Sequence, residues 1–184
     1  MSTPAIPFSA DALEDQLLAS LATTLPPYLV SMGLPHWRST VNRNDMDKWS
    51  QEQLPCLAVM CPGTVGEPRK FSDNTFLVRW AVAVAMVVSA NNEENTRNLA
   101  QQYAAAIRTC VMHNRGWTNL ARGTDWADER YDALEPDDGS ELSLAAGQVA
   151  FLVELEVRLG YPPPAPVPVT SVELDVELIP LEGT

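Results

Sequence analysis

Two segments of the chain repeat apolar residues at the spacing of an amphipathic helix. The first covers residues 11–25, where the apolar stripe consists of Leu13, Leu17, Leu21 and Leu25. Ser9 is its candidate N-cap, and Pro26 and Pro27 are expected to end it. The second helix is expected from residue 93 to about residue 114, with a stripe made of Leu99, Tyr103, Ala106, Ile107, Cys110 and Val111.

Other segments show the patterns of β-strands. Residues 54–61 form an apolar run that ends at a Pro-Gly-Thr turn, and residues 149–159 alternate between apolar and charged positions. Residues 74–89 are rich in valine and long enough for a major strand. Residues 28–53 lack a clear period, so we expect a loop there, with a short strand near residues 37–41.

The expected strand over residues 74–89 has one bulky face and one small face. Its bulky side carries valine, tryptophan and methionine, whereas the other side carries Ala81, Ala83 and Ala85. Small side chains let a neighbouring element approach closely. We therefore expect the alanine side to lie against a helix or a second sheet, with both faces covered.

The last part of the chain combines a proline-rich stretch with one more amphipathic strand. Five of the 15 prolines fall within residues 162–168, so residues 161–168 are expected to form an extended spacer of about 25 Å. Acidic residues then alternate with an apolar set that consists of Val172, Leu174, Val176 and Leu178. This alternation predicts a strand held away from the rest of the chain.

The order of these elements is helix, strands, helix, strands, which predicts the α+β class. We expect an antiparallel or mixed sheet packed by two main helices. The chain divides into an α+β domain over residues 1–160 and a proline-rich arm over residues 161–184 that carries the extra strand.

Composition excludes several classes of protein. Apolar residues make up 46 % of the chain and charged residues 20 %, which is typical of globular domains. The longest apolar run, residues 80–88, is far too short to span a bilayer, and the N-terminus shows no signal-peptide pattern. Three cysteines fit a reducing compartment better than a disulfide framework. A secreted, membrane or disulfide-stapled protein is not expected.

The net charge of −12 is concentrated in the last third of the chain. Residues 123–184 contain fourteen acidic and two basic residues, while the charges of the preceding residues nearly cancel. The chain lacks the basic footprint that grips phosphates, so specific nucleic-acid binding is not expected. An acidic surface can nevertheless lie beside DNA and keep it from sticking.

Catalytic, metal and cofactor sites are not expected from the sequence. Cys56 and Cys61 are five residues apart, so in a strand they point to opposite faces and cannot share a metal. All three cysteines are interpreted as buried apolar residues, and His36 and His113 as structural residues. No phosphate-binding loop or nucleophile elbow is present.

One acidic cluster stands out within residues 116–141, which we interpret as a long polar loop with a possible strand over residues 128–133. Its candidate functional members are Asp125, Asp128, Glu129, Asp132 and Glu135. The spacing of a calcium loop is missing. Three interpretations stay open: a solvated loop, a functional acidic lining, or a metal or acid–base site. Trp117 and Trp126 are interpreted as residues that pack the loop.

Several segments together resemble the tail terminator, or tail completion, proteins of long-tailed bacteriophages, particularly those that infect actinobacteria. The matching segments lie within residues 10–160 and read Leu-Pro-Cys-Leu-Ala-Val (54–59), Pro-Gly-Thr (62–64), Arg-Trp and the strand that follows (79–88), Tyr-Ala-Ala-Ala-Ile-Arg (103–108), Trp-Ala-Asp-Glu-Arg-Tyr-Asp (126–132) and the strand over 151–159. The arm over residues 161–184 lies outside the resemblance.

The resemblance implies a structural virion protein without catalytic residues. Such a subunit is expected to be assembled in the host cytoplasm as a ring, of six copies, on the head-proximal end of the tail tube. Its implied partners are other copies of itself, the tail tube protein and the head–tail connector proteins. DNA would pass through the channel without specific binding. The alternatives are another neck or head–tail connector protein (a stopper or adaptor) and, more remotely, a metal-dependent hydrolase that uses the acidic cluster.

Two hypotheses join this resemblance to particular residues. The acidic segment that begins at Asp125 would line the channel of the ring, because negative walls repel phosphates. The arm strand would add to a sheet edge of a neighbouring subunit or of the tube protein. The alternative for the arm is that it folds back onto the sheet of its own chain.

Overall fold

The structure is a computed structural model that describes residues 9–41, 51–72, 75–134 and 143–158. Its helices are α1 (Ala10–Thr24), α2 (Pro26–Ser31) and α3 (Glu93–His113), together with a 3₁₀ turn at Gln51–Gln53. Its strands are β1 (Ser39–Val41), β2 (Cys56–Thr64), β3 (Arg69–Ser72), β4 (Thr75–Ser89), β5 (Gly123–Leu134) and β6 (Leu144–Arg158).

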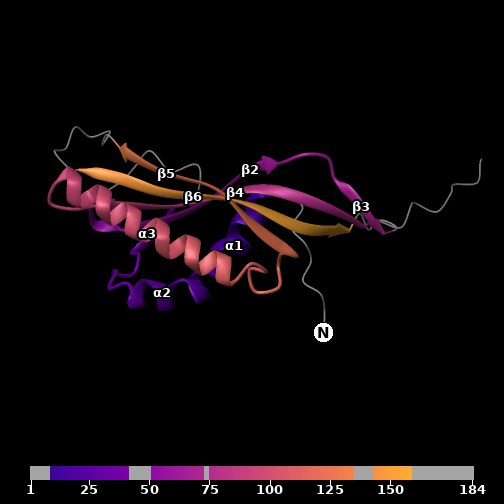
Figure 1. Cartoon of the computed structure of the whole chain (residues 1–184), viewed down its shortest axis with the longest axis horizontal. Helices are drawn as coiled ribbons and strands as arrows, with labels where there is room; N and C mark the ends of the chain where they lie inside the picture. The colour runs from indigo at the N-terminus through magenta and orange to yellow at the C-terminus, as the bar shows by residue number, and fades with distance from the viewer. Residues whose placement is uncertain (1–8, 42–50, 73–74, 135–142, 159–184) are drawn as a thin grey trace, which may run out of the picture.

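The strands form one mixed sheet, and α1 and α3 pack against one of its faces (Figure 1). The strand order is β1-β2-β4-β6-β5, and β3 pairs with the beginning of β4. Among the strands of the described residues, only β1 and β2 pair in parallel, and every other pair is antiparallel. The expected α+β class, with a mixed sheet and two main helices, is confirmed.

Helix α1 follows the leucine pattern. The Ser9 hydroxyl accepts the backbone N–H of Ala12 at 3.2 Å and caps the helix. All four stripe residues are buried: Leu13, Leu17, Leu21 and Leu25. Burial of each such side chain contributes about 1.5–3 kcal/mol to stability. The leucine spacing therefore fixes which side of α1 faces the sheet.

The prolines after α1 act differently from the prediction. They end α1, as expected, but Pro26 and Pro27 also begin α2 where a loop was predicted. Proline is tolerated in the first turn of a helix because the N–H that it lacks has no intrahelical partner there. Beyond α2 the expected short strand near residues 37–41 is present as β1.

Strand β4 lies in the middle of the sheet, between β2 and β6. Its bulky side chains, among them Val82, Val84 and Met86, join the main core with the leucines of α1 and with Tyr103 and Ile107 of α3. The alanine side points away from these two helices, and in the described ranges neither the expected helix nor a second sheet lies against it, although Ala83 and Ala85 are buried as expected. The close approach is made instead on β6.

The close approach occurs where Gly147 of β6 lies beneath α3. A Cβ atom placed on Gly147 would lie 2.2 Å from the carbonyl oxygen of Ala100 and 3.3 Å from the Cβ of Ala104. The backbone of α3 therefore rests on the sheet with no side chain between them. Because Gly147 interrupts the alternation of apolar residues, the sequence predicted β6 to begin at residue 149 instead of Leu144.

Strand β2 runs through the predicted Pro-Gly-Thr turn. Its register with β4 shifts between Met60 and Gly63, which marks an irregularity in place of a turn. The backbone N–H of Cys61 at this point donates to the Glu14 carboxylate of α1 at 2.6 Å. A side chain from the covering helix thus satisfies a donor that the strand ladder leaves free.

The cysteines behave as expected. Cys61 lies in the main core, whereas Cys56 belongs to a second cluster with Leu54, Val87 and Leu144. The two thiols therefore point to opposite sides of the sheet. All three cysteines are free and buried, and burial, with the charge of Glu14, raises the pKa of Cys61 to about 12.

Two further predictions concern the ends of the chain and the membrane. None of the helices in the described ranges is long and apolar enough to cross a bilayer. The arm over residues 161–184 and its apolar set Val172, Leu174, Val176 and Leu178 lie outside the described residues.

The contact at Gly147 generates a stability prediction. Gly147→Ala should lower the free energy of unfolding by about 2 kcal/mol or more, because the new methyl group has no room against the α3 backbone. Gly123→Ala in β5 is the matched control, since a Cβ there meets nothing within 4 Å. Urea unfolding monitored by circular dichroism compares the two. Equal stabilities of the two variants would contradict the proposed packing.

Candidate functional site

Most of the acidic candidates lie in a strand. Residues Gly123–Leu134 form β5, which extends well beyond the short strand that the sequence suggested within the predicted loop. β5 is the edge of the sheet, with β6 as its single strand neighbour in the described chain. The outer row of its backbone N–H and C=O groups is thus available for interaction.

A turn of unusual backbone conformation leads into β5. Trp117, Thr118 and Asn119 all have positive φ, between 44° and 75°. Three such non-glycine residues in a row are strained, and tertiary contacts hold them. The indole N–H of Trp117 donates to the Thr124 hydroxyl at 2.8 Å, and the Thr118 hydroxyl donates to that of Ser20 at 3.2 Å. The prediction that Trp117 packs the loop is confirmed.

A shift in register at Ala127 decides which acidic side chains share a face of β5. Trp126 pairs with Phe151 of β6, but Asp128 pairs with the next residue, Ala150. The extra residue reverses the alternation. As a result Asp125, Asp128 and Asp132 share the face of the sheet opposite α1 and α3, called the helix-free face below. Glu129 lies on the side of α3.

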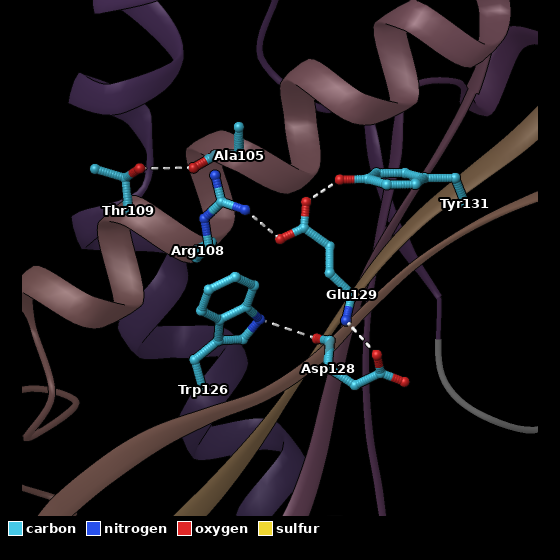
Figure 2. Close-up of polar contacts among 7 residues, drawn as sticks. All are labelled: Ala105, Arg108, Thr109, Trp126, Asp128, Glu129 and Tyr131. Carbon is cyan, nitrogen blue, oxygen red and sulfur yellow. Dashed lines mark hydrogen bonds and ion pairs between the residues drawn. The ribbon is translucent and has the colours of Figure 1, made fainter.

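Glu129 belongs to a cluster that joins β5 to α3 (Figure 2). Its carboxylate, in a side chain only 9 % exposed, accepts from Arg108 at 2.5 Å and from the Tyr131 hydroxyl. The Arg108 guanidinium also lies 4.9 Å from the ring centroid of Trp126, within range of a cation–π interaction. Trp126 is about half exposed and lies in β5, so the prediction that it packs a loop is wrong.

The environment of this cluster changes the titration of Tyr131. Burial, the hydrogen bond to Glu129 and the negative charge of Glu129 together raise the pKa of Tyr131 to about 12, and Arg108 opposes them. The phenol therefore keeps its proton and its hydrogen bond across the physiological range. The role that the geometry gives Glu129 is attachment of the edge strand to α3.

The helix-free face of β5 carries exposed and partly paired acids. Asp128 accepts from Arg130 at 2.8 Å, and this bond, with the backbone N–H of Glu129, lowers the pKa of Asp128. Asp125 pairs with Arg115 at 2.9 Å. Exposed pairs of this kind contribute little to stability, because solvent screens them. These residues mainly determine the charge of the surface, because β5 holds four acidic residues and one basic residue.

The remaining candidates do not join this site. Glu135 lies outside the described residues. His36 is hydrogen-bonded to the carbonyl of its neighbour Trp37, and His113 to the Tyr28 hydroxyl. In the ranges that the structure describes, no group of three His, Cys, Asp or Glu side chains could hold a metal ion.

A basic surface at the far end of the sheet is a feature that sequence reasoning missed. Strand β3 lies near the right end of the sheet in Figure 1. It presents Arg69 and Lys70, both exposed, and half-exposed Phe71. The Arg122 guanidinium lies 4.0 Å from the Phe71 ring centroid and pairs with Glu156 at 3.1 Å. The adjacent basic residues at 69 and 70 were the available signal, but nothing in their spacing predicted a strand.

Comparison with known proteins finds similarity among solved structures, at low identity. No protein-family model matches the chain, and no curated protein does. Among solved structures the chain is similar to one described as "Virion of native gene transfer agent (GTA) particle". The identity is 11 %, the TM-score is 0.46, and the match covers 82 % of this chain and 99 % of that one. A likeness of this size does not by itself say what the chain does.

The Glu129 cluster generates a titration prediction. Glu129→Gln should lower the pKa of Tyr131 from about 12, but leave it above the ordinary value near 10, because burial is the largest cause of its rise. The stability that depends on this raised pKa is present below pH 10 and is lost as pH rises through about 12. NMR of ¹³C-labelled tyrosine across pH measures the shift.

Two controls accompany this titration. The pKa of Tyr103, also raised to about 12 but by burial alone, should stay constant and serves as the internal reference. Asp132→Asn removes a charge from the opposite face of the same strand and should leave Tyr131 unchanged. An unaltered Tyr131 in the Glu129→Gln variant would exclude the proposed coupling.

Proposed function

We propose that this chain is a structural protein of a phage-type virion and acts as a tail terminator. In this proposal six copies form a ring on the head-proximal end of the tail tube. The ring stops polymerisation of the tube and offers the surface to which the head connector binds. The protein carries out no catalysis and uses no cofactor.

The resemblance in sequence supports the proposal because its segments fall on connected elements. Residues 54–59 and 79–88 belong to or border the paired strands β2 and β4, and residues 103–108 lie in α3, which covers them. Residues 126–132 lie in β5, which pairs with β6. The segments therefore describe one sheet with its covering helix.

The observation that carries the proposal is the exposed edge strand with an acidic helix-free face. A channel through which DNA passes needs walls that repel phosphate and hold no base. Asp125, Asp128 and Asp132 share such a face with one base, Arg130, so the net charge of these four residues is negative. We assign the three aspartates to the channel wall. Glu129 is bound to Arg108 and Tyr131, so the assignment does not depend on it.

A nonsense mutation in the gene for this chain tests the proposal. A terminator limits tube growth, so its loss should give tails longer than those of the parent phage, seen by negative-stain microscopy. Complementation with the intact chain should restore the normal length. Tails of normal length detached from heads would instead identify another head–tail connector protein.

The channel assignment generates a separate prediction. The triple variant D125N/D128N/D132N should assemble normally but slow the passage of DNA, because phosphates would interact with a neutral wall more readily than with an acidic one. DNA release from purified particles is followed by the fluorescence of an intercalating dye. The control D15N/E67Q/E94Q removes the same charge at exposed positions on α1, α3 and the turn before β3. Equal release rates in both variants and the parent would refute the assignment.

A further inference from the structure

We infer that the arm strand of one subunit, residues 171–178, pairs with the edge strand β3 of a second copy of this chain. This inference rests on the proposed assembly into a ring. It selects one sheet edge and one partner from the alternatives that the sequence left open.

The described chain offers β3 as an edge with a free side. β3 pairs with residues at the beginning of β4, and it has no other strand neighbour among the described residues. All four of its residues are exposed. An unpaired edge of this kind can accept an extended segment through main-chain hydrogen bonds.

Charge distinguishes β3 from the other edges. The arm strand carries Glu173, Asp175 and Glu177 and no basic residue. β5, at one edge of the sheet, holds four acids and one base, so an acidic strand added there would place like charges opposite each other. β3 holds two bases and no acid, and β1 is a three-residue strand without charge. The acidic strand is therefore complementary to β3.

The geometry of β3 makes this complementarity independent of the way the arm faces. Arg69 pairs with Leu77 of β4, and Lys70 pairs with Phe76. Because consecutive strand residues point to opposite faces, one basic side chain lies on each side of the sheet. The acidic side of the arm meets a base in either orientation.

Apolar surface at the same place suits the other side of the arm. Phe71 is 50 % exposed, and Val65, in the turn before β3, is 45 % exposed. The apolar residues of the arm strand, Val172, Leu174, Val176 and Leu178, would cover such surface and gain about 25 cal/mol for each Å² removed from water.

The length of the spacer favours a second copy over the same chain. β6 ends at Arg158, which pairs with Thr75 of β4, and β3 pairs with the same stretch of β4. The arm thus leaves about 10 Å, or two strand spacings, from the β3 of its own chain. β3 is only about 13 Å long, whereas the expected spacer over residues 161–168 is about 25 Å. A straight spacer carries the arm strand past its own β3.

A zero-length carbodiimide cross-link in the full chain tests the contact. The chain has two lysines, Lys48 and Lys70, and the arm forms one tryptic peptide because no lysine or arginine follows Arg158. In a mixture of ¹⁴N- and ¹⁵N-labelled protein, we expect Lys70 joined to the 159–184 peptide in pairs of mixed isotope. Lys70→Arg keeps the charge and should abolish this product, whereas Lys48→Arg should retain it.

The outcomes separate the arm contact from the proposed function. The native mass of the same sample reports the ring independently, through a multiple of the 20.2 kDa subunit. A ring without mixed-isotope product overturns the arm contact and leaves the terminator proposal standing. Products of single isotope overturn it as well, since they show the arm on its own chain. A monomer at every concentration counts against the ring, and the absence of mixed product from that sample overturns the contact too.

Charge reversal provides a second test with a different readout. R69E/K70E, or E173K/D175K/E177K, should each raise the dissociation constant for self-association by about tenfold, because like charges then face each other. Mixing the two variants should restore assembly, since every contact in an alternating ring again joins opposite charges. R38E/R97E, at exposed sites just before β1 and on α3, is the control and should have little effect. Rescue only when both changes are on one chain would refute pairing between copies.

Discussion

The close approach of α3 to β6 at Gly147 determines the position of everything that α3 carries. With no side chain between the Ala100 backbone and the strand, the helix lies at its minimum distance from the sheet. Arg108, two turns further along α3, then reaches Glu129 on the edge strand. A larger residue at 147 would push the helix away from the sheet, which would strain the contact between Arg108 and Glu129.

In edge strand β5, one extra residue at Ala127 decides which side chains face α3 and which face away from it. The helix side is occupied by Glu129, Tyr131 and Trp126, all in contact with one another or with Arg108. The other side carries Asp125, Asp128 and Asp132, together with Arg130, which pairs with Asp128. Regular alternation from Asp125 would have put Asp128 and Asp132 on the helix side. The register shift at Ala127 thus places Glu129, which binds α3, on one face, and the exposed residues Asp128 and Asp132 on the other.

The two ends of the sheet differ in charge in a way that fits a repeating assembly. A ring built from identical subunits joins one patch of each subunit to a different patch of the next. In the proposed ring, β3 would supply a basic patch and the acidic residues of the arm a complementary one. β5, which is acidic and bound to α3, lies on the opposite side of β4 from β3, so in the proposed ring it would stay free to form a wall beside DNA.

The sequence by itself determined the elements whose apolar residues follow a simple period. The sequence predicted α1, α3 and β4 correctly. In each of them the apolar residues that pack on the core recur every 3.6 residues, for a helix, or every 2 residues, for a strand. It also determined that Cys56 and Cys61 face opposite sides. These properties are local, so spacing along the chain is sufficient to predict them.

Only the tertiary structure decided features that depend on a partner far along the chain. The sequence predicted a turn at Pro62 and Gly63. In the structure β2 continues through them, and Glu14 of α1 accepts the backbone N–H of Cys61 where the register with β4 shifts. The sequence did not predict the start of β6, because Gly147, which contacts α3, interrupts its apolar alternation. The faces of β5 depend on its register with β6. No local sequence pattern predicts these three features, because the contacts that stabilise them join residues that are far apart in the chain.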